Sequence, residues 1–302
     1  MQSGKKQTID LTNLVVRGVK GGTMIRLEGV RIGFGGVPLL KDVSFEVHPG
    51  EKVSLVGPGG SGKSTILKIL LGLLKPDGGQ VGLMGLDMVG SPEGERQKIL
   101  RSVGMAFQQG ALFDFMTVRE NLVFAMEHMT ALTPAEMDRR IKTLLQGVKL
   151  GRTENMYPYE LSGGMQRRVG IARALCTSPQ IAIFDEPTSG LDPVTSTIIL
   201  NMINALANPE QAGAETGRSR QNSEARIQMI VTSNIEIGIR FADRLIVIND
   251  GCVVADGPWR ELLLTGSEWV RHFLGVRFIG LDLEYAHELR LPQEFIQRHW
   301  PS

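Results

Sequence analysis

The sequence predicts an α/β fold with a mixed sheet, and three parts of the chain carry this prediction. The apolar run Val53–Val56 leads into a glycine-rich stretch, and Ile66–Leu71 follows it with the pattern of a helix. Upstream, residues 24–30 and 43–47 alternate between apolar and polar side chains, as half-buried strands do. Downstream, residues 180–186 form a buried strand that ends in two carboxylates. We therefore expect early antiparallel strands followed by a parallel core.

The glycine-rich stretch 57–65 fits the P-loop pattern G-x-x-x-x-G-K-[ST]. Its residues are Gly57, Pro58, Gly59, Gly60, Ser61, Gly62, Lys63, Ser64 and Thr65. Glycines let backbone N–H groups close around a phosphate, and the helix N-terminus adds the positive end of its dipole. In this pattern Lys63 reaches the β- and γ-phosphates, and the Ser64 hydroxyl binds Mg²⁺. The alternative is a glycine-rich turn with a chance lysine, and the flanking strand and helix argue against it.

Composition excludes several classes of function. The 302 residues, 42% of them hydrophobic, can bury one large core or two modest ones. A net charge of +1 gives no whole-chain attraction to nucleic acid or lipid, so we expect no nucleic-acid partner. Cys176 and Cys252 make no metal pattern and suit core or near-core positions in a reducing compartment. With no secretory signal and no apolar stretch long enough to cross a bilayer, we expect a chain that is soluble by itself.

The chain divides into a main domain, an insertion and two ends. The expected parts are a flexible tail at 1–22, the main domain at 23–260, a helical subdomain at about 109–165, a polar loop at 208–226 and a helical extension at 261–302. Residues 117–150 have helical periodicity. Within them, Thr133, Pro134 and Glu136 predict a helix start, with threonine as the cap and proline at the first position.

A second motif, Leu161–Gln166, lies between the P-loop and the strand that ends in Asp185 and Glu186. With those motifs it resembles the LSGGQ-type signature of ABC transporter ATP-binding subunits, with Met165 in place of glutamine, and the resemblance covers roughly residues 24–260. It implies the ABC ATPase fold, a P-loop NTPase core with a mixed sheet, an N-terminal antiparallel β subdomain and an inserted helical subdomain.

The resemblance also implies a head-to-tail dimer in which the signature of one copy closes over ATP held by the P-loop of the other. The signature residues that would face this ATP are Ser162, Gly163 and Gly164. A serine hydroxyl and backbone N–H groups at a helix start can donate to a γ-phosphate. The alternative for an isolated Ser-Gly-Gly is an ordinary helix cap.

The other motifs follow in family order, and the resemblance gives each a role. Phe34 would stack on adenine, although it could instead be a core aromatic. Gln108 would contact Mg²⁺ and the attacking water, and Asp185 would bind Mg²⁺. Glu186 would polarise the water for attack on the γ-phosphate, and Asp192 would cross the dimer interface. Two adjacent carboxylates at the end of a buried strand cost free energy unless they are paired or bound to a metal, which favours this interpretation.

One position departs from the family pattern. In the family, the strand after the Asp192 helix ends in a histidine that contacts the γ-phosphate, and here Ser233 stands in that place. A serine is shorter and cannot act as an imidazole, so hydrolysis could fall by the ~10²–10⁴ that a positioned acid–base group contributes. Because Glu186 is intact, we expect slow hydrolysis rather than none. Asn234 is a second hydrogen-bond donor that could reach into the site.

Three further segments indicate which transport system the chain serves. Gly110–Phe113, Thr117–Asn121 and Ser267–Leu274 resemble the ATPase of the Mla-type, MCE-associated lipid transporters. This resemblance implies phospholipid cargo, a permease in the inner membrane with this chain at its cytoplasmic face, a periplasmic MCE-domain protein and a small accessory subunit.

In the family a groove of the helical subdomain receives a coupling helix from the permease, and Phe113, Phe115 and Met116 would lie near it or be buried within the subdomain. Two other functions stay open. One is the ATPase of a small-solute importer, and the other is a nucleotide-gated assembly module that hydrolyses ATP weakly because of Ser233.

Overall fold

The computed structural model describes residues 22–207, 226–275 and 290–299. The expected tail, nearly all of the polar loop and part of the C-terminal extension lie outside the described residues. The boundaries of these parts therefore stay predictions.

One mixed sheet of ten strands runs through the described residues, in the order β5-β4-β1-β2-β10-β9-β3-β8-β7-β6. The strands are β1 Ile25–Phe34, β2 Val37–Val47, β3 Lys52–Val56, β4 Gly78–Leu83, β5 Leu86–Asp87, β6 Val103–Ala106, β7 Ile181–Asp185, β8 Ile227–Thr232, β9 Arg244–Asn249 and β10 Cys252–Pro258. Strands β5, β4, β1 and β2 are antiparallel, whereas β9, β3, β8, β7 and β6 are parallel. Strand β10 joins the two parts, antiparallel to β9 and parallel to β2. The predicted sequence of antiparallel strands and then a parallel core is confirmed.

Strand β1 is longer than the alternation at 24–30 predicts. Its pairing with β2 continues to Phe34 opposite Val37, but the register shifts between Leu27 and Val30. Gly29 lies in this irregularity with a φ of 60°. A bulge of this kind shifts the phase of the alternation by one residue, so a single pattern of period two does not run through the whole strand.

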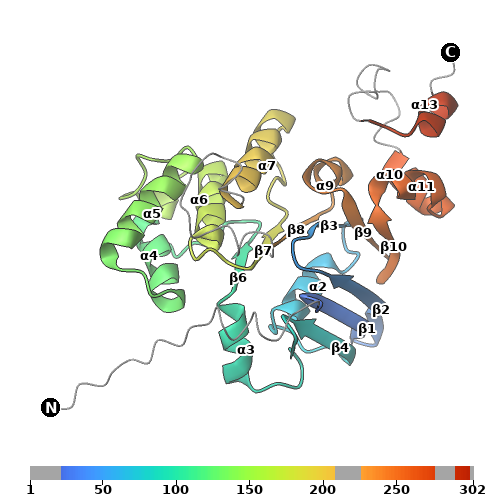
Figure 1. Ribbon diagram of the computed structural model, residues 1–302, viewed down its shortest axis with the longest axis horizontal. Coiled ribbons are helices and arrows are strands. Elements are labelled where there is room, and N and C mark those ends of the chain that lie inside the picture. Colours follow the sequence, from blue (N-terminus) through green and yellow to red (C-terminus); the bar gives the residue numbers. More distant parts are fainter. Residues whose placement is uncertain (1–21, 208–225, 276–289, 300–302) are drawn as a thin grey trace.

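Helices cover both faces of the parallel core (Figure 1). They are α2 Lys63–Leu70, α3 Glu93–Leu100, α4 Val118–Met129, α5 Pro134–Gly147, α6 Gly163–Leu175, α7 Pro193–Ala207, α9 Ile235–Phe241, α10 Trp259–Thr265, α11 Glu268–Gly275 and α13 Gln293–His299, with a 3-10 turn η1 at Pro158–Glu160. The predicted helix start at Pro134 is confirmed, because Thr133 and Glu136 form a reciprocal capping box there. Among the described residues, no helix is long and apolar enough to span a membrane.

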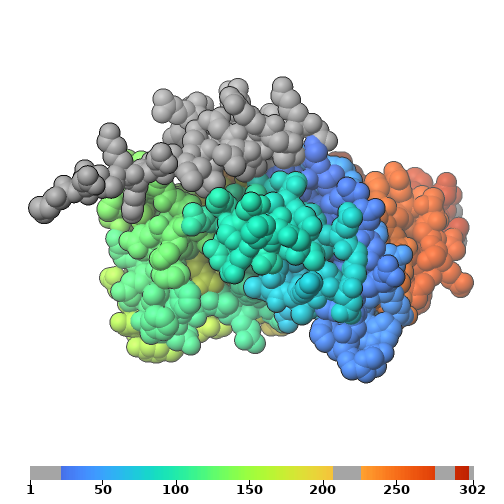
Figure 2. Space-filling view, turned by 90° about the horizontal axis from the view of Figure 1, so that it is seen from below, coloured from blue at the N-terminus to red at the C-terminus, as the bar shows by residue number. Residues whose placement is uncertain are grey.

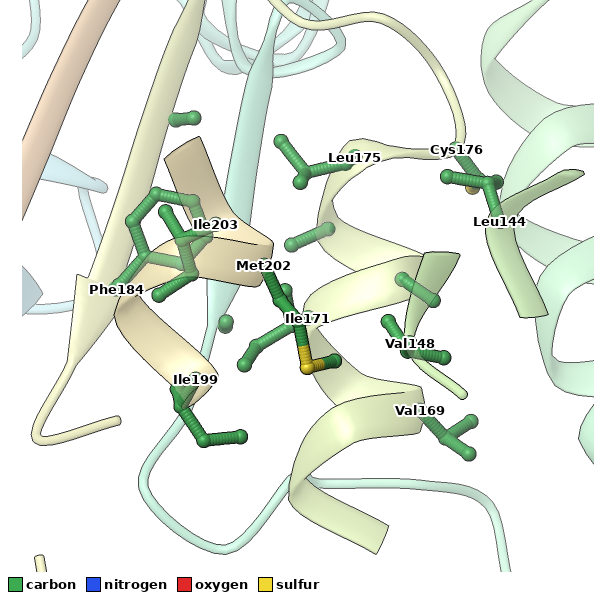
Figure 3. Packing of buried hydrophobic residues seen from close by; sticks show 14 of the residues in the cluster. Leu144, Val148, Val169, Ile171, Leu175, Cys176, Phe184, Ile199, Met202 and Ile203 are labelled. Carbon is green, nitrogen blue, oxygen red and sulfur yellow. The ribbon is translucent and has the colours of Figure 1, made fainter. Parts of the chain in front are cut away.

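The faces of each core strand pack against different helices. In β7, Ile181 and Ile183 lie in the cluster that contains α2, and Ala182 and Phe184 lie in the cluster that contains α4 to α7. Side chains alternate in this way because successive residues of a strand point to opposite faces. Figure 3 shows the second cluster, in which Phe184 of β7 meets side chains of α6 and α7.

The C-terminal helices form a third cluster on the same face of the sheet as α4 to α7, next to β9. Trp259 and Leu263 of α10, Leu274 of α11 and Phe295 of α13 are buried there with Leu245 of β9. In Figure 2 these helices (orange) lie beside the N-terminal strands (blue), on the side away from the green helical layer.

The cysteines match expectation, since Cys176 is buried and Cys252 is half-buried.

Candidate functional site

The site lies where the carboxyl ends of three neighbouring parallel strands meet. Val56 at the end of β3 is paired with Thr232 at the end of β8, and Val231 of β8 is paired with Asp185 at the end of β7. The P-loop follows β3 directly. In open α/β sheets, ligands bind in the crevice at the carboxyl ends of the strands. The order of the strands therefore brings the P-loop, the Asp185–Glu186 pair and the end of β8 together.

Two P-loop glycines are required by the surrounding chain. A Cβ on Gly57 would lie 2.1 Å from the carbonyl oxygen of Ile248. Gly62 has a φ of 101°, and a Cβ there would lie 2.4 Å from a methyl carbon of Leu40. By contrast, a Cβ on Gly59 or Gly60 would meet nothing within 4 Å. Gly60 has a φ of 77°, which itself favours glycine, whereas nothing among the described residues requires a glycine at Gly59. A loop that lets its backbone approach a phosphate closely accounts for Gly59.

The Lys63 side chain points back into its own loop. Its Nζ donates to the carbonyl oxygens of Gly57 and Pro58, both at 2.8 Å. The ammonium is buried, and this burial lowers the pKa of Lys63, although the nearby carboxylates Glu186 and Asp185 act in the opposite direction. Phosphate oxygens can replace these carbonyls as acceptors and would add opposite charge, which suits an anion-binding lysine.

Asp185 has the environment of a metal ligand. Its Oδ1 is buried and, among the described residues, has no hydrogen-bond partner. Burial and the neighbouring Glu186 raise the pKa of Asp185 to about 6, and Lys63 only partly offsets them. A buried oxygen without a partner is rare in folded proteins, and a bound cation would satisfy it. Magnesium is usually held by one or two carboxylates together with substrate phosphates, so Asp185 with the exposed Ser64 at the start of α2 fits Mg²⁺.

Glu186 is fixed to the end of β8 by three hydrogen bonds. Thr232 Oγ1 donates to its Oε2 at 3.0 Å, and the backbone N–H of Ser233 donates to its Oε1 at 2.7 Å. The backbone N–H of Glu186 donates to the Val231 carbonyl at 2.8 Å. Glu186 has a φ of 44°, an uncommon conformation for a non-glycine residue. The Ser233 side chain is exposed, and the Asn234 side chain accepts from the Glu236 N–H as the cap of α9.

Gln108 and Asp192 border this centre. Gln108 follows β6, and its Nε2 donates to Ser189 Oγ at 3.3 Å, three residues beyond Glu186. Asp192 accepts from the backbone N–H and the hydroxyl of Thr195 at the start of α7. These two bonds lower the pKa of Asp192 and keep it charged at the helix N-terminus.

The signature segment Leu161–Gln166 is built on the start of α6. Ser162 caps the helix by accepting from the Met165 N–H, and a Cβ on Gly163 or Gly164 would meet nothing within 4 Å. Gln166 Nε2 donates to the Pro158 carbonyl at 2.8 Å and so ties the segment to η1. No hydrogen bond among the described residues joins Ser162, Gly163 or Gly164 to the P-loop of the same chain. The exposed backbone at this helix start leaves room for a group from outside the chain.

Phe34, the predicted contact to adenine, is exposed. It ends β1 beside the Gly35–Gly36 turn, and 53% of its surface is exposed. An exposed aromatic is not a core residue, so the alternative that Phe34 is a core aromatic is wrong. Phe113 and Phe115 are exposed as well, at 37% and 75%. They lie in a segment, Gly110–Thr117, that is held by hydrogen bonds from a side chain of α4.

Asn121 of α4 is that anchor. It is fully buried, its Oδ1 accepts from the Phe113 N–H, and its Nδ2 lies within 3.1 Å of the carbonyls of Phe113, Met116 and Thr117. Arg173 Nη2 donates to the Gly110 carbonyl. Sequence reasoning used Asn121 only as part of a resemblance and missed Thr232 and Ser189 entirely. Thr232 could have been found from its place beside Ser233 at the end of a buried strand.

The P-loop, the adjacent Asp-Glu pair and the second glycine motif at a helix start define a P-loop ATPase with a signature segment. Residues 40–189 match the family described as "ABC transporter". The chain is 35% identical over 258 residues to the chloroplastic protein TRIGALACTOSYLDIACYLGLYCEROL 3 of Arabidopsis thaliana, covering 83% of this chain and 73% of that one. It is 35% identical over 242 residues to the arginine transport ATP-binding protein ArtM of Bacillus subtilis, covering 80% and 94%. The chain therefore belongs to the ABC transporter family as an ATP-binding subunit.

Solved structures agree with this assignment. The dimeric bacterial ABC transporter cassette MJ0796 superimposes with a TM-score of 0.66 at 34% identity, covering 78% of this chain and 98% of that one. A post-hydrolysis dimer of the same cassette, bound to ADP and Pi, has a TM-score of 0.65 at 33% identity, with the same coverage. The predicted fold class is confirmed, and the chain is an ATPase.

Proposed function

We propose that this ATPase energises phospholipid transport between membranes together with a permease and an MCE-domain protein, as two copies paired head to tail. The observation that carries the cargo class is the segment from Gly110 to Asn121, which resembles the Mla-type ATPases and which the Asn121 bonds fix in the structure. The relative in Arabidopsis supports a lipid cargo in the broader sense, since its name contains that of a glycolipid.

The site residues divide the work of hydrolysis. Phe34 stacks on the adenine, and the P-loop residues Gly57–Thr65 hold the phosphates with Lys63. Ser64, Asp185 and Gln108 would hold Mg²⁺, which would offset phosphate charge when bound. Ser162, Gly163 and Gly164 of the second copy donate to the γ-phosphate.

Glu186 accepts a hydrogen bond from the attacking water. The water oxygen bonds to the γ-phosphorus as the bond to the bridging oxygen breaks, and ADP leaves with that electron pair. The water proton passes to Glu186 and then to the phosphate product. Ser233 contributes its backbone N–H to Glu186.

A groove of about 380 Å³ suits the permease. It is lined by apolar side chains of β6, α4 and the segment that follows β6, among them Phe107, Phe113, Phe124 and Met129. Each of these four is between 37% and 39% exposed. Exposed aromatic and methionine side chains around a hollow are typical of a surface that receives an apolar helix. We assign this groove to a helix of the permease, which holds the chain at the cytoplasmic face of the membrane.

A small-solute importer is the second candidate. The relative ArtM favours it, since its name is that of an arginine transport ATP-binding protein. The chain beyond residue 260 favours lipid transport over this reading, because Ser267–Leu274 resembles the tail of the lipid transporters.

Co-purification separates these candidates. The full chain would be tagged, expressed in its own host and solubilised in mild detergent, with Phe124→Ala as the variant that alters the lining of the groove. We expect a permease and an MCE-domain protein to co-purify, with bound phospholipid, and to be depleted in the variant. Co-purification of a soluble solute-binding protein instead would contradict the proposal.

A further inference from the structure

The end of β8 holds both oxygens of the Glu186 carboxylate. Thr232 Oγ1 lies 3.0 Å from Oε2, and the Ser233 backbone nitrogen lies 2.7 Å from Oε1. An ionised carboxylate only accepts hydrogen bonds, so Thr232 and Ser233 are the donors. A carboxylate held at both oxygens has little freedom to rotate about its last torsion.

The Thr232 hydroxyl is itself held in one orientation. It accepts from the Asn234 backbone N–H at 3.1 Å, and the residue is fully buried. A hydroxyl has one proton, and here the Asn234 N–H occupies an oxygen lone pair while the proton points to Glu186. The β-branched side chain is also stiff about its first torsion. The two hydrogen bonds therefore run in one direction: the Asn234 N–H donates to the Thr232 hydroxyl, and the hydroxyl donates to the Glu186 carboxylate.

We propose that Thr232 is the positioning residue for Glu186, and that with the Ser233 backbone N–H it orients the carboxylate without help from the side chain at position 233. This inference rests on the proposed role of Glu186 toward the attacking water. It accounts for how the chain keeps an oriented Glu186 although Ser233 stands where the family has histidine, since every residue except proline supplies the same N–H.

The test compares Thr232→Val with Thr232→Ser in the full chain, within the complex with its membrane partner. Valine keeps the branched shape and removes the hydroxyl, whereas serine keeps the hydroxyl. A hydrogen bond to a charged group corresponds to about a tenfold to hundredfold change in rate. We therefore expect kcat to fall by this factor in Thr232→Val, with KM and the ATP dissociation constant within about twofold of wild type, and to recover in Thr232→Ser.

Thr153→Val is the matched control. Thr153 is also buried, and its hydroxyl donates to the Leu150 carbonyl at 2.9 Å, away from the site. We expect it to lower the unfolding midpoint as a lost buried hydroxyl does, with kcat unchanged. If Thr232→Val does not fold, Thr232→Ala gives the same comparison with a smaller side chain.

Three results would overturn the inference. These are a kcat of Thr232→Val within about threefold of wild type, equal losses in the serine and valine variants, or a loss of ATP affinity that matches the loss of kcat. The variant Glu186→Gln distinguishes failure of this inference from failure of the proposed role of Glu186. If Glu186→Gln remains active, the role of Glu186 fails; if it is inactive while Thr232→Val is normal, only the positioning role fails.

Discussion

Asn121→Ala tests whether one buried amide anchors the segment that we assign to the permease surface. The Asn121 Oδ1 accepts one backbone N–H, and Nδ2 lies within 3.1 Å of three carbonyls. An amide nitrogen carries two protons, so at most two of these carbonyls are bonded at one time. Three bonds at about 0.5–1.5 kcal/mol each give a loss of about 2–4 kcal/mol in the free energy of unfolding. That is a large part of the ~5–15 kcal/mol by which proteins are usually stable.

The assay is urea unfolding of the full chain, followed by circular dichroism, with Asn201→Ala as the matched control. Asn201 lies on the exposed face of α7, so the same change there is expected to shift stability by less than about 0.5 kcal/mol. We also expect less permease to co-purify with Asn121→Ala, because Phe113 loses both of its backbone bonds to Asn121. A loss of stability below about 1 kcal/mol, or one equal to that of Asn201→Ala, would refute the reasoning.

Three further substitutions follow from the site. Gly163→Leu adds a side chain where the chain leaves open space, so we expect the free energy of unfolding to stay within about 0.5 kcal/mol of wild type. We expect the ATP-dependent dimer to be lost, as measured by light scattering, and a normal dimer would contradict the role of the signature. Asp185 has a folded pKa of about 6, above its ordinary 3.8, so its contribution to stability without nucleotide is greatest at low pH and is lost as pH rises through 6. Asp185→Asn is therefore expected to be more stable than wild type at pH 7, with the difference shrinking between pH 6 and pH 4 in unfolding titrations; a constant difference would be inconsistent with this. Ser233→His is expected to raise kcat, by at most the ~10²–10⁴ that a fully positioned acid–base group contributes, and an unchanged or lower kcat would show that the serine costs nothing.

The sequence predicts the centre of this fold because its signals are local. The P-loop, its strand and its helix follow one another in the chain, and the capping box at Thr133 lies within four residues. A glycine in a turn motif, such as Gly62, also predicts a backbone position with positive φ, because few other residues adopt that conformation.

What the sequence does not reveal depends on residues that are distant along the chain. The bond between Thr232 and Glu186 joins residues 46 positions apart, and it exists because β7 and β8 are neighbours in the sheet. A one-dimensional pattern holds no information on which two strands are adjacent. Asn121 is similar in kind, since its burial depends on how α4 packs against α6. The exposure of Phe34 also depends on the folded structure, so the sequence alone does not distinguish an adenine contact from a core aromatic.

The most direct test of the account is steady-state ATP hydrolysis by the full chain with its membrane partner, wild type beside Glu186→Gln. We predict that wild type turns over slowly and that Glu186→Gln abolishes turnover while ATP still binds, because the carboxylate is the group that polarises the water. If wild type hydrolyses ATP no faster than Glu186→Gln while both bind it, the chain is a nucleotide-dependent clamp rather than a transport motor, and the account is wrong.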